Sequence, residues 1–227
     1  MTFTDDLTLM IDLLVLVTAA AFYTGVTVWF QLSRGDLGRA RAHLREGSIA
    51  MGGLGAIIGL FAFWGEFTWP LSLVFSGSNV LAAYDILFFD SLMMLAFLLV
   101  SFAIAVNLRL PTHMVGVLGI FIGAAIFFYG YRAYNLSLTE QPLETFLMFL
   151  AFGGVAILSY PATLFVDLYV VGPQNPEVAP FTDGPKPSYP MLWSAVAALF
   201  LVMIVLAGIA AVAYGYTAAW GHLANPP

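Results

Sequence analysis

Six long stretches of the sequence contain no aspartate, glutamate, lysine or arginine and consist mostly of apolar residues. A helix needs about 20 residues to cross roughly 30 Å of bilayer hydrocarbon at 1.5 Å per residue. The stretches are residues 13–33, 47–65, 91–108, 110–131, 145–166 and 191–220. The sequence therefore predicts an all-α integral membrane bundle of six transmembrane helices, which forms a single domain over residues 1–227.

The composition excludes several classes of protein. Only 9% of the residues are charged, against roughly a quarter in a soluble domain, so most of the surface must face lipid. A formal net charge of −6 without a basic stripe argues against a nucleic-acid partner. The absence of cysteine excludes disulfides, thiolate metal sites and a cysteine nucleophile.

The basic residues predict the orientation of the bundle. Six of the seven fall in connections that six spans place on one side: Arg34, Arg39, Arg41, Arg45, Arg109 and Lys186. Basic residues favour the cytoplasmic side of short membrane loops. We therefore expect a cell-membrane protein with its basic loops in the cytoplasm and both termini outside. Arg132 is the one base on the outer side.

Two connections are rich in turn-forming residues. Residues 67–84 include proline, glycine, serine and asparagine, which predicts an interfacial or re-entrant segment with an additional span as the alternative. Residues 172–190 hold six of the twelve prolines and predict an extended cytoplasmic loop. This loop is either a stiff connector or a strap that lies on a partner subunit.

Acidic residues gather near the outer ends of the first three predicted helices. They are Asp12, Glu66, Asp85 and Asp90. Ionisable residues in a membrane are functional candidates, so one interpretation is an outward-facing site for a cation or a proton. In the alternative, Asp85 caps the start of its helix, and Arg132, Tyr129 and Tyr131 satisfy the other acids.

The sequence gives few signs of a catalytic, cofactor or metal site. The only lysine, Lys186, lies in a loop, and the sequence contains no phosphate-binding loop and no H-E-x-x-H or G-x-S-x-G motif. His43 and His113 share the cytoplasmic side, where a haem or metal site is conceivable, but no histidine lies in mid-span. Asp167 follows Pro161, which we expect to kink its helix, and is interpreted as an interfacial helix end. We expect no enzyme activity and no cofactor.

Two G-x-x-x-G motifs, at residues 55–59 and 119–123, predict close contacts between helices. Packing within the chain is the favoured interpretation. Contact with other membrane subunits or with a second copy is the alternative.

One stretch resembles a known family. Trp69-Pro70-Leu71 and the run from Tyr84 to Ser91, YDILFFDS, are similar to the domain of unknown function 981, a family of mostly archaeal multi-pass membrane proteins. Its pattern is W-P-L followed by Y-N-I-L-F-x-D-P, so Asp85 replaces Asn and Ser91 replaces Pro. The resemblance implies a membrane fold, and it directs attention to Asp90, which keeps the family's acid.

These features predict a non-catalytic membrane protein that serves as an accessory or scaffold subunit of a larger assembly. The alternative is a small cation or proton pathway entered through the outer acids. A haem- or metal-binding membrane protein is the third possibility.

Overall fold

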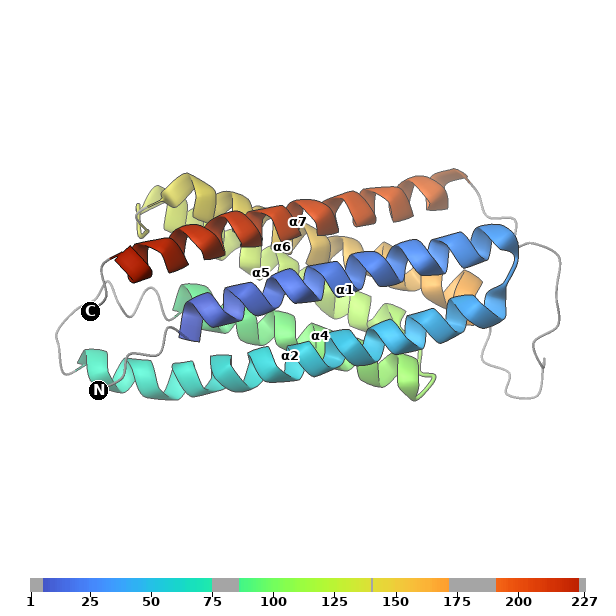
Figure 1. Ribbon diagram of the computed structural model, residues 1–227, viewed down its shortest axis with the longest axis horizontal. Helices are drawn as coiled ribbons and strands as arrows, with labels where there is room; N and C mark the ends of the chain where they lie inside the picture. Colours follow the sequence, from blue (N-terminus) through green and yellow to red (C-terminus); the bar gives the residue numbers. More distant parts are fainter. Residues whose placement is uncertain (1–5, 75–85, 140, 172–190, 225–227) are drawn as a thin grey trace.

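The computed structural model describes residues 6–74, 86–139, 141–171 and 191–224. Over these residues the protein is built from helices and short turns, without strands, which confirms the predicted all-α class. Six long helices run side by side along one axis (Figure 1): α1 (Asp6–Arg34), α2 (Leu37–Val74), α4 (Ser91–Asn107), α5 (His113–Asn135), α6 (Pro142–Phe165) and α7 (Met191–Ala224). Two π-helical segments extend the bundle: η1 (Ile86–Asp90) precedes α4, and η2 (Val166–Val171) follows α6.

Each of the six helices is long and apolar enough to cross a bilayer. Within the described residues their apolar spans are 21 to 31 residues long, so the predicted number of spans is confirmed. The segment 67–84 differs from expectation, because α2 continues through Pro70 and ends only at Val74. The remainder of that segment and the proline-rich loop 172–190 lie outside the described residues.

The helices form a closed ring. Each one packs mainly against two others, in the order α1, α2, α4, α5, α6, α7 and back to α1. The α5–α6 contact is the most extensive, and the direct contact between α4 and α5 is the least. The start of α1 and the end of α7 lie at one end of the bundle, and the α1–α2 and α4–α5 turns lie at the other (Figure 1).

Three helices end in left-handed turns that satisfy their last carbonyl groups. After α1, the N–H of Asp36 donates to the Gln31 carbonyl and Gly35 has a φ of 81°, a Schellman arrangement in which glycine is favoured. Arg109 and Ser137 take the same place after α4 and α5, with φ values of 57° and 48°. The chain thus reverses within a few residues at each of these points.

The glycines of both G-x-x-x-G motifs face neighbouring helices of the same chain. A Cβ added at Gly55 would lie 2.7 Å from the Cβ of Leu99 on α4. One added at Gly123 would lie 2.5 Å from the carbonyl oxygen of Gly153 on α6. The motifs therefore form the α2–α4 and α5–α6 seams, as the favoured interpretation predicts.

A pair of glycine substitutions tests this role. Gly123→Ala places a methyl group against the α6 backbone, so we expect a loss of roughly 1–3 kcal/mol in the free energy of unfolding. At Gly53 a Cβ meets nothing within 4 Å, so Gly53→Ala should be neutral or stabilise by up to about 1 kcal/mol. Unfolding of the purified protein from mixed micelles measures both. Equal effects of the two substitutions would contradict the α5–α6 seam.

Candidate functional site

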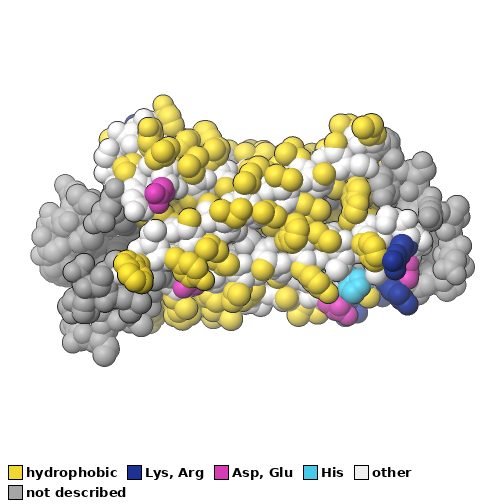
Figure 2. All heavy atoms as spheres, turned by 45° about the horizontal axis from the view of Figure 1, so that its top comes forward, with side chains coloured by type: hydrophobic (Ala, Val, Ile, Leu, Met, Phe, Trp, Pro, Cys, Tyr) yellow, Lys and Arg dark blue, Asp and Glu magenta, His cyan; other side chains and the backbone are white. Residues whose placement is uncertain are grey.

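The charged side chains collect at the two ends of the bundle. Five arginines lie at the end that holds the α1–α2 and α4–α5 turns, which we call the basic end: Arg34, Arg39, Arg41, Arg45 and Arg109. Asp12, Glu66 and Asp90 lie toward the opposite, acidic end. On the face drawn in Figure 2, apolar side chains cover the middle of the bundle and the basic side chains cluster at one end.

Two of the predicted site acids share a neighbour at the acidic end. The side chains of Tyr129 on α5 and of the half-buried Asp90 lie close enough to interact, and Glu66 of α2 lies close enough to act on the same tyrosine electrostatically. Asp90 ends η1, and its side chain does not cap α4. These three side chains come from α2, η1 and α5, and η1 contacts both of those helices.

The other predicted site residues do not join this group. Asp12 lies on the α1–α7 seam, where its Oδ1 is 2.9 Å from the position of a Cβ on Gly215. The side chains of Arg132 and Tyr131 are exposed, and within the described ranges Arg132 forms no ion pair with the acids. Asp85 lies outside the described residues.

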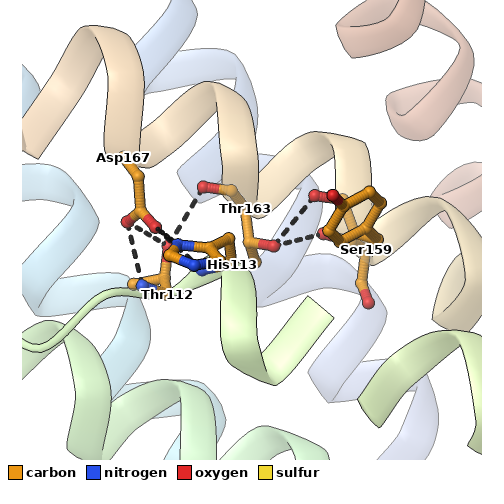
Figure 3. Close-up of polar contacts among 6 residues, drawn as sticks. Thr112, His113, Ser159, Thr163 and Asp167 are labelled. Carbon is orange, nitrogen blue, oxygen red and sulfur yellow. Dashed lines mark hydrogen bonds and ion pairs between the residues drawn. The ribbon is translucent and has the colours of Figure 1, made fainter. Parts of the chain in front are cut away.

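A denser polar group lies at the basic end, around Asp167 of η2 (Figure 3). Its Oδ1 accepts hydrogen bonds from the backbone N–H of Thr112, at 2.9 Å, and from the Thr112 hydroxyl, at 2.7 Å. Its Oδ2 accepts from the backbone N–H of His113, at 2.8 Å, and contacts the His113 Nδ1 at 2.7 Å. Because the carboxylate is the acceptor, Nδ1 carries the hydrogen in this contact.

The Asp167 carboxylate serves as the N-terminal cap of α5. That helix begins after Pro111, and its own N-cap residue, Thr112, supplies no side-chain cap. The free N–H groups of a first helical turn favour a negatively charged acceptor, and Asp167 provides one from another helix. The carboxylate side chain is only 16% exposed, so the cap is largely shielded from solvent.

A second cap in the same layer holds the end of η2. The Nε of Arg41, on α2, donates to the Val170 carbonyl at 2.6 Å, and its Nη2 donates to the Val171 carbonyl at 3.2 Å. Nearby, Arg45 donates to Asn107, whose amide in turn donates to Ser48. Side chains of α2 thus donate hydrogen bonds to backbone carbonyls of η2 and to the Asn107 side chain of α4. We call Arg41, Thr112, His113 and Asp167 the cap cluster.

Each histidine whose side chain is described has an acidic partner. His43 pairs with Glu46 at 3.6 Å, and His113 belongs to the cap cluster. Within the described ranges, no three His, Asp or Glu side chains come close enough to hold a metal ion. The side chain of His222 is not among those described.

Between the two ends, the interior of the ring is apolar. It contains a cavity of about 230 Å³ to which all six long helices contribute. Its hydroxyl groups come from α1 and α6: Thr18, Thr24, Ser159 and Thr163. Each of them donates to a carbonyl of its own helix. No charged side chain lines this cavity.

Sequence reasoning names both His113 and Asp167 but does not bring them together. They are 54 residues apart and lie in different helices, so spacing along the chain carries no signal for their contact. One usable signal is the start of α5, where Pro111 is followed by a helix that lacks an acidic first turn. Such a helix needs an acceptor from elsewhere.

Comparison with known proteins identifies the family. A family model described as "Protein of unknown function (DUF981)" matches residues 1–225, so the chain belongs to this family. No curated protein and no solved structure gives a significant match to the chain.

A substitution at Asp167 tests the cap. Asp167→Asn keeps the shape but replaces one acceptor oxygen with a donor that faces N–H groups, so we expect a loss of roughly 2–4 kcal/mol in the free energy of unfolding. Glu46→Gln, which alters an exposed ion pair, should change that free energy by less than about 1 kcal/mol. Unfolding of both variants from mixed micelles measures the difference, and an unchanged Asp167→Asn would refute the cap.

Proposed function

We propose that this member of the DUF981 family is a non-catalytic multi-pass membrane protein that acts as an accessory or scaffold subunit of a larger membrane assembly. One observation carries the proposal. The polar groups of the acidic end and those of the cap cluster are separated by an apolar ring interior.

The lining of that interior favours a structural role over transport. An ion or a proton that crosses the ring needs polar groups able to exchange partners along its route. The four hydroxyls that line the cavity are instead bonded to their own helices. The cap cluster also supports a structural role, because its carboxylate accepts from four donors that define the start of α5.

A partner would use the sides of the bundle. The glycines of the two G-x-x-x-G motifs are covered within the chain, so we expect another subunit to pack elsewhere. The helix α7 is the most accessible candidate, because only 17% of its apolar span is buried inside the protein.

A cation or proton site at the acidic end is the second candidate function. The proximity of Asp90 to Tyr129, with Glu66 nearby, supports it. This arrangement gives Asp90 a partner whose hydroxyl can both donate and accept a hydrogen bond.

We also place the protein in the cell membrane, with the basic end in the cytoplasm and the acidic end outside. The five arginines at the basic end support this orientation.

Reconstitution separates the two candidate functions. Purified protein in liposomes with an imposed pH or potassium gradient should show no flux above that of empty liposomes, and Asp90→Asn should change nothing. In native membranes extracted with mild detergent, the chain should migrate as part of a species larger than the recombinant 24.6 kDa protein in the same detergent. Flux that Asp90→Asn abolishes, while Glu144→Gln at an exposed acid preserves it, would replace the scaffold with the pathway.

The orientation is tested by labelling. The chain contains no cysteine, so single substitutions introduce unique thiols. In intact cells, a membrane-impermeant maleimide should label Leu136→Cys, in the exposed α5–α6 turn, and should label Ala42→Cys, at the exposed basic end, only after lysis. The opposite pattern would invert the orientation.

A further inference from the structure

Aromatic side chains cluster near each end of the cavity inside the ring. Toward the acidic end, the ring of Phe88 lies 5.7 Å from Phe149 and 6.0 Å from Tyr214, measured between centroids. Toward the basic end, the ring of Phe165 lies 6.1 Å from Trp29 and 6.2 Å from Trp193. The space between these two clusters therefore lies within the membrane-spanning part of the bundle.

The cavity is elongated along the helix axes. On α1 its lining residues run from Leu14 to Trp29, a separation of 15 residues that corresponds to about 22 Å at 1.5 Å per residue. They recur at helical spacing and form one stripe of α1: Leu14, Val17, Thr18, Ala21, Thr24, Gly25, Val28 and Trp29. A volume of about 230 Å³ spread over that length describes a narrow channel rather than a rounded chamber.

Water is a poor occupant of this space. A buried water molecule needs two to four polar partners, but the hydroxyls in the lining already donate to their own helices, and the other lining side chains are apolar except for the indole of Trp29. An apolar cavity of about 150 Å³ is large enough to hold a benzene ring. The cavity in this protein is larger, and its surroundings are a solvent made of hydrocarbon chains.

We propose that the ring holds one linear hydrocarbon chain, lying along the bundle axis between the Phe88 and Phe165 aromatic clusters. On the same scale this volume holds about nine carbon atoms, so the channel takes a segment of the tail of a membrane lipid or of an isoprenoid, which share this chemistry. The chain enters between helices from the bilayer, because the protein does not fully enclose the cavity. The α4–α5 seam is the place where neighbouring helices contact each other least, and both contribute lining residues, among them Leu98 and Val115.

Two adjacent alanines of α7 provide a matched test. Ala197 lines the cavity, whereas Ala198 points away from it and is exposed on the side of the bundle. Ala197→Phe fills the channel, and Ala198→Phe adds the same ring to the lipid-facing surface. Ala21→Phe fills the channel from α1 and serves as a second blocking variant.

The first measurement is the amount of hydrocarbon-chain molecule retained per protein chain after extensive detergent washing, determined by solvent extraction and mass spectrometry. We expect about one molecule per chain in the wild type and in Ala198→Phe, and about tenfold less in Ala197→Phe and Ala21→Phe, because the added rings occupy the channel. The masses assign the molecule to straight-chain lipids or to isoprenoids.

The second measurement shows whether loss of the ligand reflects misfolding. Palmitic acid and geranylgeraniol, added separately to washed protein, should raise the unfolding temperature of the wild type and of Ala198→Phe, since a ligand stabilises the state that binds it. The blocking variants should unfold at or above the temperature of the washed wild type and should not respond to either probe. The probe with the larger effect identifies the preferred chain.

Several outcomes would overturn the proposal. They are a wild type that retains no stoichiometric chain and responds to neither probe, equal retention in all variants, or equal losses in Ala197→Phe and Ala198→Phe. None of these outcomes bears on the scaffold role, which the flux and size measurements test separately.

Discussion

The structure depends on one constraint: backbone hydrogen-bonding groups in lipid need partners inside the protein. The cap cluster shows how this need is met. In lipid, a backbone N–H or carbonyl group that lacks a partner inside the protein costs several kcal/mol, and every helix end exposes such groups. The start of α5 meets this requirement through Asp167, a residue of η2, and the end of η2 meets it through Arg41 of α2. Three separate elements therefore complete one another at the basic end, and their relative positions are fixed by hydrogen bonds rather than by packing alone.

The same constraint explains why the middle of the ring is apolar although it contains hydroxyl groups. Threonine and serine can donate to a carbonyl of their own helix, about one turn earlier, and Thr18, Thr24 and Ser159 do so. Such residues add no polar surface to the cavity. Glycine seams bring the backbones of α2 and α4, and of α5 and α6, into close contact around the ring. The cavity lies at the centre of the ring, where no helix passes.

The sequence predicts the features that depend on local pattern, and it misses those that depend on contacts between distant residues. Six spans follow from six apolar stretches, and the inward glycine faces follow from the G-x-x-x-G spacing. The continuation of α2 through Pro70 contradicts the local turn signal. The pairing of Asp167 with His113, and the separation of Asp12 from Asp90 and Glu66, follow from the order of helices around the ring. That order has no signature in the sequence.

Both ends of the bundle have an aromatic cluster, but the basic end is also held by charge-assisted hydrogen bonds. At the basic end, charge-assisted hydrogen bonds link α2, η2 and α5, and they require specific geometry. At the acidic end, aromatic packing around Phe88 joins η1, α6 and α7, beside the Asp90–Tyr129 contact. Aromatic contacts tolerate small shifts more readily than directional hydrogen bonds do. We therefore expect the helices to shift less at the basic end than elsewhere in the ring.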